Sequence, residues 1–285
     1  MQPAATDPFA PSAAAIEEVF EQFEQAKTTP LQMCVDLGDG RFVKCRFASL
    51  RREAEALQFV RANTTIPVPS VLLVFQREDK WYLVMETIGG TTLSLHCKNM
   101  STTQLVEIAN TLKEYMYQLE NLGAHRCIMG SWLKGPFSNV FFALARHYRF
   151  KVPLPTDEYN NMADFHRYWV QRLGDHPQCD FLRDALSKEV LSEDKVVLSH
   201  GDLNVSNIMV SADGHILSVL DWDTFGWYPA FWEPMSMWRG GRWRTEWLNA
   251  LETVFKQTDM GTTYITVLDF LGTDYFTSDD FDDLL

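Results

Sequence analysis

The sequence is poor in the residues that stabilise small secreted proteins. It has five cysteines in 285 residues, an odd number, and no two of them form a Cys-x-x-Cys pair. We therefore expect neither a disulfide framework nor a cysteine-based zinc site, and we expect a reducing compartment, the cytoplasm. No apolar run reaches about 18 residues, so no membrane span is predicted. The first 15 residues lack a basic side chain and an apolar signal-peptide core, which argues against secretion.

Positive charge is also scarce. The chain has 25 Lys and Arg against 38 Asp and Glu, a formal net charge of −13. A surface of this sign disfavours nucleic acid and anionic membranes as partners, and it favours a cationic small molecule. The length allows one large domain or two lobes with a shared interface. The oligomeric state does not follow from the sequence.

Glycine is absent before Gly38, and the N-terminal third alternates between strand and helix patterns. Residues 1–14 are rich in alanine and proline, and we expect them to be disordered. An Asp-Gly turn in "LGDG" predicts a hairpin. Apolar spacing then predicts, in chain order, a helix at 15–26, strands at 31–37 and 41–47, a helix at 50–63, and strands within 66–75 and 80–88.

The pattern changes after Gly89-Gly90, where we place a lobe boundary. Further helices are predicted at 102–122, 137–147, 161–174 and 178–189, followed by a hairpin and a Trp-rich helical tail. The fold class is therefore α+β. Residues 15–90 form a small lobe with an antiparallel sheet, and residues 91–285 form a larger, mainly helical lobe.

The stretch "LSHGDLNVSNIMV", residues 198–210, carries several polar residues between two apolar strips. "SADGH" then predicts a turn, and "ILSVLD" predicts a return strand that ends on Asp221. This hairpin brings Asp202, Asn207 and Asp221 near one end. Carboxylate and amide oxygens suit Mg²⁺, and a carboxylate beside them can accept a proton from a hydroxyl. Both features are typical of phosphoryl transfer. The simpler alternative is that these residues only cap turns.

The segments "HGDLNVSNIMV" and "VLDWDTFGWYPAFWE" resemble the aminoglycoside phosphotransferase and choline-kinase-like superfamily. They are especially similar to fungal members with "GWYPxYWE" after the metal-binding aspartate. The resemblance covers about residues 31–247. It implies a bilobal protein-kinase-like fold and transfer of the γ-phosphate of ATP, with Mg²⁺, to a hydroxyl of a small molecule.

The resemblance also implies roles for four residues of these two segments. Asp202 matches the catalytic base, and His200 matches the loop histidine that braces the loop. Asn207 and Asp221 match the Mg²⁺ ligands. Two neighbours stay open: Asp223 supports the metal or is structural, and Asn204 orients the loop through its side chain.

Five residues of the small lobe match the nucleotide site of the family. Lys44 matches the lysine that contacts the α- and β-phosphates, and Glu53 matches its ion-pair partner. The backbone of Glu86 and Ile88 would hold adenine, and Met85 would line the back of the site. Alternatives are that Lys44 is a solvated strand lysine, or that Glu55 is its partner.

The sequence departs from the family pattern at its start. Kinases cover the ATP phosphates with a glycine-rich loop, but here "EEVFEQFEQA" and "KTTP" precede Leu31. Thr28 and Thr29 are candidates for phosphate contact in its place. This departure motivates two other hypotheses: a kinase-like binding protein or pseudoenzyme without phosphotransfer, and a kinase-like fold reused for a non-phosphoryl reaction.

The acceptor cannot be named from the sequence, because function depends on the site and not on the fold. Candidate acceptor-site residues are Ser131, Trp132, Phe137 and Trp238. The tryptophans of the tail would either stack a flat substrate or, more commonly, pack helices. The acidic run at 279–283 would either attract an amine or form a solvated tail.

Overall fold

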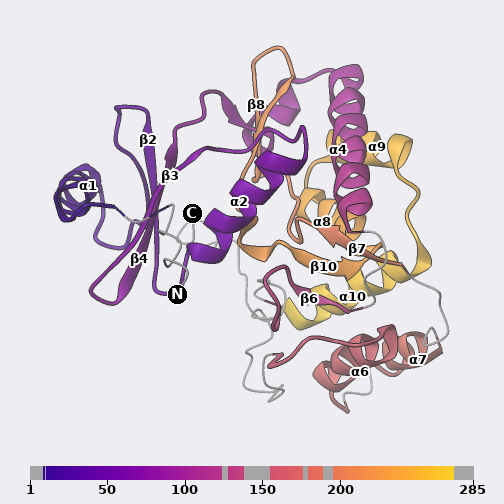
Figure 1. Ribbon diagram of the computed structural model, residues 1–285. Helices are drawn as coiled ribbons and strands as arrows, with labels where there is room; N and C mark the ends of the chain where they lie inside the picture. The colour runs from indigo at the N-terminus through magenta and orange to yellow at the C-terminus, as the bar shows by residue number, and fades with distance from the viewer. Residues whose placement is uncertain are drawn as a thin grey trace. The chain divides into compact units, whose positions relative to one another are not determined.

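The computed structural model describes residue 9 and residues 11–123, 128–137, 155–175, 179–188 and 195–272 (Figure 1). The chain divides into two compact units. The first contains residues 1–92 and 208–223, and the second contains residues 93–207 and 224–285. The expected helix at 137–147, except for Phe137, and the acidic run at 279–283 lie outside the described residues.

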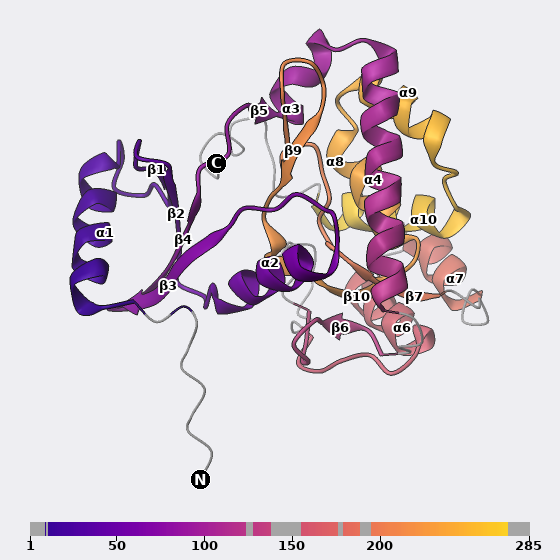
Figure 2. The ribbon, with the colours of Figure 1, turned by 45° about the horizontal axis from the view of Figure 1, so that its top comes forward.

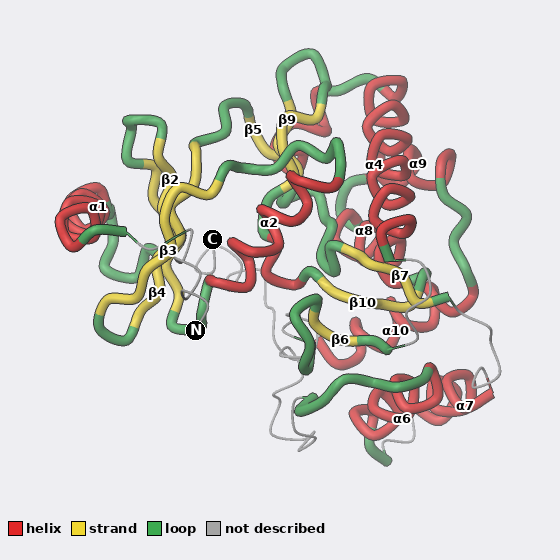
Figure 3. Tube along the Cα trace, viewed as in Figure 1, coloured by secondary structure: helices red, strands yellow, loops and turns green. Residues whose placement is uncertain are grey.

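The first unit is built on a four-stranded antiparallel sheet (Figure 3). Its elements are α1 (Ala13–Ala26), β1 (Cys34–Asp36), β2 (Arg41–Arg46), α2 (Arg51–Asn63), β3 (Val71–Arg77) and β4 (Lys80–Glu86). The strand order is β1-β2-β4-β3. The antiparallel sheet of the α+β prediction is therefore confirmed.

Helix α1 packs against one face of this sheet, as Figure 2 shows. Its apolar side holds Val19 and Phe23, which are buried with Val43 of β2 and Tyr82 of β4. The rings of Phe23 and Tyr82 meet edge to face with their centroids 5.5 Å apart. An amphipathic helix gains most of its stability from such packing. Helix α1 is therefore part of the core of this unit.

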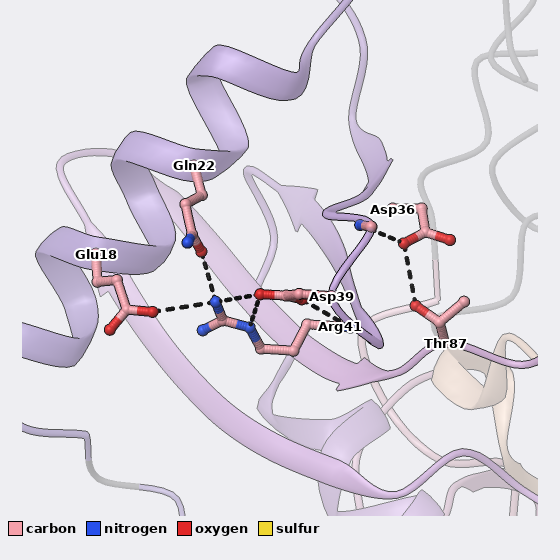
Figure 4. Close-up of polar contacts among 7 residues, drawn as sticks. Glu18, Gln22, Asp36, Asp39, Arg41 and Thr87 are labelled. Atoms are coloured by element: carbon pink, nitrogen blue, oxygen red, sulfur yellow. Dashed lines mark hydrogen bonds and ion pairs between the residues drawn. The ribbon is translucent and has the colours of Figure 1, made fainter.

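A polar network joins α1 to the turn between β1 and β2 (Figure 4). The guanidinium group of Arg41 donates to Gln22 at 2.6 Å and to Glu18 at 3.0 Å, both on α1. Its Nε atom donates to Asp39 in the turn at 2.9 Å. Arg41 is the first residue of β2, so these bonds connect the strand to α1 and to the β1–β2 turn.

Ordered structure begins earlier than composition predicts. The side chain of Ser12 caps α1 by accepting a hydrogen bond from the backbone N–H of Ala15 at 3.2 Å. Phe9 is buried, and its carbonyl accepts a hydrogen bond from Val74 at 3.5 Å. Residues 1–8 and residue 10 of the expected disordered segment lie outside the described part of the chain.

The first unit also contains a small sheet of β5 (Thr91–Thr92), β8 (Ile208–Val210) and β9 (Ile216–Val219), in the order β5-β8-β9. The sequence analysis assigned the β8–β9 hairpin to the C-terminal lobe. It belongs to the first unit because β8 pairs with β5 and Val219 donates to the carbonyl of Pro67 at 2.8 Å.

The second unit is mainly helical, as predicted. Its elements are α3 (Leu93–His96), the 3₁₀ helix η1 (Cys97–Asn99), α4 (Thr102–Leu122), β6 (Gly130–Ser131), α6 (Met162–Leu173), α7 (Asp180–Lys188), β7 (Val196–Ser199), β10 (Gly226–Pro229), α8 (Trp232–Gly241), α9 (Thr245–Val254) and α10 (Asp259–Gly272). A 3₁₀ turn, η4 (Trp222–Thr224), lies where the chain returns to this unit. Helices α4 and α9 lie side by side (Figures 1 and 2).

Strand β10 is the centre of a third antiparallel sheet, with the order β6-β10-β7. Its residues, Gly226–Pro229, begin the segment "GWYPAFWE", and the local sequence pattern did not predict a strand there. No helix in the described residues is both long and apolar enough to cross a membrane.

The tryptophans of the tail mostly pack the core of the second unit. The buried ones are Trp227, Trp232, Trp238 and Trp247, whereas Trp243 is 79% exposed. Trp232 joins an aromatic core with Phe165, Trp169 and Tyr264. The burial of these four tryptophans is what helix packing predicts, and Trp243 differs from them.

Candidate active site

Lys44 lies in the interior of the first unit, on the face of β2 opposite to Val43 and Cys45. Its Nζ atom is 2.8 Å from a carboxylate oxygen of Glu53 and 2.5 Å from Oδ1 of Asp221. Burial opposes the charge of this lysine, but the charges of Glu53, Asp221 and Asp223 outweigh it and raise its pKa above the ordinary value. Lys44 is therefore a charged, buried group and not a solvated strand lysine.

Glu53 reaches Lys44 from the first turn of α2, and its side chain is 1% exposed. Burial raises the pKa of Glu53 to about 7, although the charge of Lys44 lowers it. The rival, Glu55, forms an ion pair with Arg51 at 3.3 Å on the surface of the same helix. Of the two glutamates, the structure brings Glu53 to the lysine.

Asp221 and Asp223 follow β9 and place two carboxylates close together. Asp221 has a φ of 64°, an uncommon conformation for a residue other than glycine, and 42% of its side chain is exposed. Burial and the charge of Asp221 raise the pKa of Asp223 to about 6. A divalent cation bound at the partly exposed Asp221 would offset the repulsion between these two carboxylates.

The donor set is small, as suits Mg²⁺. The described residues contain no group of three or more His, Cys, Asp or Glu side chains arranged to hold a metal. Mg²⁺ commonly uses one or two carboxylates and completes its shell with water and substrate phosphates. The carboxylates of Asp221 and Asp223 are hard oxygen donors of the kind that Mg²⁺ uses.

The expected adenine-binding residues lie at the end of β4. Met85 is buried, and the N–H of Glu86 donates to the carbonyl of Ser70 at 3.0 Å. The carboxylate of Glu86 also accepts from the hydroxyl of Ser70 at 2.5 Å. Ile88 follows β4 and is partly buried. Two hydrogen bonds to Ser70, the residue before β3, thus hold Glu86 in place.

Thr87 connects this segment to the β1–β2 turn (Figure 4). Its N–H donates to the carbonyl of Gly40 at 2.8 Å, and its hydroxyl donates to Asp36 at 3.2 Å. The same oxygen of Asp36 accepts from the N–H of Gly38 at 2.8 Å. The turn and the segment after β4 therefore hold each other in place.

Phe42 is a further candidate that the sequence analysis did not single out. It lies two residues before Lys44 in β2, so alternation places both side chains on one face of the sheet. Its Cα partners across the sheet are Asp36 and Met85. An aromatic ring beside Met85 suits a flat ligand, and the two-residue spacing from Lys44 was the available signal.

The loop after β7, in the second unit, holds Asp202 by hydrogen bonds. The N–H of Asp202 donates to Nδ1 of the buried His200 at 3.2 Å. The amide of Asn204 donates to the Asp202 carboxylate at 3.1 Å, and that of Asn207 donates to the Asp202 carbonyl at 2.9 Å. The amide oxygen of Asn207 is then the atom suited to ligate a cation. Asn204 orients the loop, as its type and position indicated.

A second missed residue is Glu233, near the start of α8. It is 2% exposed, and its two carboxylate oxygens accept hydrogen bonds from the N–H groups of Gly201 and Leu203, each at 2.8 Å. Burial raises its pKa to about 7, and the amide donors act against this. The signal was an acidic residue inside the apolar "GWYPAFWEPM".

The candidate acceptor-site residues are largely engaged in packing. Ser131 is buried in β6. Trp132, Phe137 and Trp238 each lie against another aromatic ring. The exposed Trp243 differs from them. An acceptor-binding role for any of the four stays a prediction.

Similarity to solved structures identifies the fold as protein-kinase-like. The crystal structure of an aminoglycoside-3'-phosphotransferase of type VIII matches with a TM-score of 0.52 at 18% identity, over 81% of this chain and 84% of that chain. A thermostable mutant of aminoglycoside phosphotransferase APH(4)-Ia in apo form matches with a TM-score of 0.55 at 14% identity, over 88% and 85%. Its ternary complex with AMP-PNP and hygromycin B matches with a TM-score of 0.54 at 14% identity, over 88% and 84%.

These structures define the class by its fold, which is that of the kinase-like phosphotransferases. The chain belongs to the phosphotransferase enzyme family, whose sequence model matches residues 41–263. No curated protein sequence matches the chain. The resemblance found in the sequence motifs is confirmed.

Proposed function

We propose that this protein is an ATP- and Mg²⁺-dependent phosphotransferase that transfers the γ-phosphate to a hydroxyl of a small molecule. The observation that carries the proposal is the buried Lys44 between Glu53 and Asp221, at 2.8 and 2.5 Å. Burying charged groups is expensive, and such groups cluster at functional sites. A charged lysine there can neutralise phosphate oxygens.

The nucleotide side of the proposal rests on the first unit. Lys44 would contact the α- and β-phosphates, and the backbone of Glu86 and Ile88 would bind the adenine edge. Met85 and Phe42 would contact the ring. The complex of the structurally similar APH(4)-Ia with AMP-PNP supports a nucleotide as ligand.

Asp202 is proposed as the general base. It accepts the proton of the acceptor hydroxyl as the acceptor oxygen bonds to the γ-phosphorus and the bond to the bridging oxygen of ADP breaks. The bond from Asn204 orients the carboxylate for this task. His200 supports the loop through the backbone of Asp202 and does not take part in proton transfer.

Asn207 and Asp221 are proposed as the Mg²⁺ ligands, with Asp223 as a supporting carboxylate. When bound, Mg²⁺ supplies charge neutralisation at the phosphate oxygens. The carboxylate pair and the amide oxygen are hard donors that fit this ion. The ion pair with Lys44 holds one oxygen of Asp221 in a fixed direction.

The acceptor is proposed to be a small hydroxylated molecule. The net charge of −13 supports a cationic acceptor over nucleic acid or a membrane surface.

The location is proposed to be the cytoplasm. The described residues include four free thiols, those of Cys34, Cys45, Cys97 and Cys179, and free thiols are typical of a reducing compartment.

A second candidate is a nucleotide-binding protein without phosphotransfer. It is favoured by the segment before β1, where α1 and a glycine-free connection stand in place of a glycine-rich loop. The N–H and hydroxyl of Thr28 both donate to Gln32, at 2.8 and 3.0 Å. These groups are thus used within the connection.

Calorimetric titration of ATP, with and without Mg²⁺, tests the proposal. Wild-type protein should bind ATP more tightly with Mg²⁺, and Asp221→Ala should weaken Mg·ATP binding at least tenfold. Asp202→Ala should bind Mg·ATP within about twofold of wild type but lose turnover, because it lacks only the proton acceptor. Asp213→Ala is the matched control, since Asp213 is an exposed aspartate of the same hairpin.

The outcomes separate the two candidates. Mg²⁺-dependent binding without ATP consumption across hydroxyl acceptors would favour the binding protein. Full turnover in Asp202→Ala would remove Asp202 as the base. Absence of ATP binding under every condition would contradict both candidates.

A further inference from the structure

Arg46, the last residue of β2, lies on the same face of the sheet as Lys44. It follows Lys44 by two residues, and strand side chains alternate, so both point away from the face on which α1 packs against Val43 and Cys45. The Nη1 atom of Arg46 contacts Sγ of Cys34 at 3.8 Å, and Cys34 is the Cα partner of Lys44 on β1. The face that carries Lys44 thus carries a second cationic side chain.

The guanidinium group of Arg46 is anchored at one of its nitrogens. Arg46 is partly buried, and its Nη1 atom donates to the carbonyl of Cys45 at 2.9 Å in addition to the contact with Cys34. A guanidinium presents several N–H donors in a planar fork. The contacts at Nη1 hold this fork in place, and the donors of Nε and Nη2 remain for a ligand.

The partners of Arg46 differ from those of other basic residues in the first unit. Four basic residues of this unit form ion pairs with carboxylates: Lys27, Arg41, Arg51 and Arg77. Within the part of the chain that the structure describes, Arg46 contacts a carbonyl and a thiol instead. The chain has 38 Asp and Glu against 25 Lys and Arg, so carboxylates are plentiful. An arginine that contacts none of them is suited to bind an anion from outside.

The carboxyl groups around Lys44 leave little positive charge for a ligand. The charges of Glu53, Asp221 and Asp223 all act on this one lysine. Arg46 acts on the same group, since its charge lowers the pKa of Asp223, which burial raises. The phosphates of a nucleotide would bring further negative charge to this place. A second cation of the protein would therefore favour their binding.

The connection between α1 and β1 uses N–H groups that a glycine-rich loop would offer to phosphates. The N–H of Thr28 donates to the side chain of Gln32 at 2.8 Å, and the N–H of Gln32 donates to the carbonyl of Thr29 at 3.2 Å. The connection ends beside the two cations, because the carbonyl of Met33 accepts from the N–H of Cys45 at 2.7 Å. Phosphate donors at this end of the sheet are therefore better supplied by β2.

The position of Arg46 along β2 indicates which phosphate it would contact. At the start of the strand, Arg41 pairs with Glu86, in the segment proposed to bind adenine, and at its end Arg46 pairs with Trp81. A strand rises about 3.3 Å per residue, so Arg46 lies roughly 7 Å farther from that segment than Lys44. Because Lys44 is proposed to contact the α- and β-phosphates, Arg46 is placed for the γ-phosphate.

We propose that Arg46 binds the γ-phosphate of the nucleotide, and that this side chain of β2 supplies a contact that kinases take from a glycine-rich loop. The planar fork of an arginine matches two phosphate oxygens at once. The inference rests on the proposed function, because it assumes that the site at Lys44 binds Mg·ATP. It does not depend on the identity of the base or of the acceptor.

Calorimetric titration of ATP, ADP and AMP, each with Mg²⁺, into Arg46→Gln tests the inference. Glutamine keeps an NH₂ donor for the Cys45 carbonyl but removes the charge and the fork. We expect the affinity for ATP to fall about 10- to 100-fold, as for the loss of a charge-assisted hydrogen bond. The affinity for ADP should fall less, and that for AMP should stay within about twofold of wild type.

Arg61→Gln is the matched control. Arg61 also donates to a backbone carbonyl, that of Val68 at 3.3 Å, but it lies exposed near the end of α2. This variant should bind all three nucleotides as wild type does. Arg46→Lys keeps the charge without the fork, and its affinity for ATP should lie between those of wild type and Arg46→Gln. It is also the variant to measure if Arg46→Gln does not fold.

The outcomes separate this inference from the proposed function. An affinity for ATP that is equal in Arg46→Gln and Arg61→Gln would overturn the inference and leave the proposed function standing. Equal losses for ATP, ADP and AMP would also overturn it, because they indicate a damaged sheet, and equal losses for ATP and ADP alone would contradict a contact with the γ-phosphate. A wild-type protein that binds ATP through Arg46 but shows no turnover would contradict phosphotransfer and support the inference. A wild-type protein that does not bind ATP would contradict both.

Discussion

Gly201, between His200 and Asp202, has a φ of 91° and no space for a side chain. An alanine Cβ there would lie 2.6 Å from the carbonyl of Thr224 and 2.8 Å from the hydroxyl of Tyr228. The backbone would have to shift, and the shift would move Asp202. We expect Gly201→Ala to lower kcat at least 100-fold while the affinity for Mg·ATP changes less than threefold, measured by steady-state kinetics and calorimetry.

Gly40→Ala separates this clash from backbone strain. Gly40 has a similar φ of 90°, but a Cβ atom there would meet nothing within 4 Å. It should therefore show only the strain of a left-handed residue, about 1–3 kcal/mol of stability, with kcat near wild type. Equal kcat in the two variants would contradict the argument from the clash.

The residues of the candidate site differ in how well they could be predicted from the sequence. Asp202, Asn207 and Asp221 lie within 20 positions in recognisable motifs, so a role could be proposed for each from the sequence. Glu233 was not, because its partners at Gly201 and Leu203 lie about 30 positions earlier and only burial reveals the contact. The residue type marks only an acidic side chain within an apolar segment and does not show which backbone N–H groups it binds.

At the scale of elements, α1 lies before residues 41–263, the part of the chain that the family model matches. Phe23 is 1% exposed and meets Tyr82 edge to face. Truncation of a buried phenylalanine commonly costs about 3–5 kcal/mol. Phe23→Ala should therefore lower the melting temperature of the protein in thermal denaturation by several degrees, far more than Glu21→Ala on the exposed side of the same helix. A melting temperature equal in the two variants would show that α1 is dispensable.

Helices were easier to predict than short strands. The expected helix at 102–122 has the observed bounds of α4, because its periodicity and the capping box of Ser101 and Gln104 are local. Strand β10 and the two-residue β5 were not predicted, since each depends on a partner strand distant in the chain. Strand formation reflects packing against such partners more than local preference.

At the scale of the whole molecule, the chain passes between the two units three times, after Thr92, Asn207 and Asp223. A single sequence boundary near Gly90 could not represent a unit made of two separate segments. The proposed metal ligand Asn207 is the last residue before one crossing, and Asp223 is the last before another. The motif proposed to carry the chemistry thus contains two of the three positions at which the chain changes units.

Among the described residues, the pKa is raised for three carboxyl groups, those of the buried Glu53 and Glu233 and of the partly buried Asp223. A raised pKa in the folded state means that the folded protein binds the proton more tightly than the unfolded chain does. Such a group contributes stability below its unfolded pKa, and the contribution is lost as the pH rises through the folded value. These groups should make the protein less stable near pH 8 than near pH 5.

Glu233 gives the clearest test of this pH dependence. Its pKa is raised from 4.5 to about 7, mainly by burial. The corresponding contribution to stability is on the order of 3 kcal/mol, and it is lost between about pH 4.5 and pH 7.5. Replacing the glutamate by glutamine removes the titration, so the melting temperature of Glu233→Gln should fall less over this range than that of wild type or of the control Glu252→Gln, on the exposed side of α9. Parallel melting curves for all three proteins would mean that Glu233 titrates at its ordinary pKa, held down by the amides of Gly201 and Leu203.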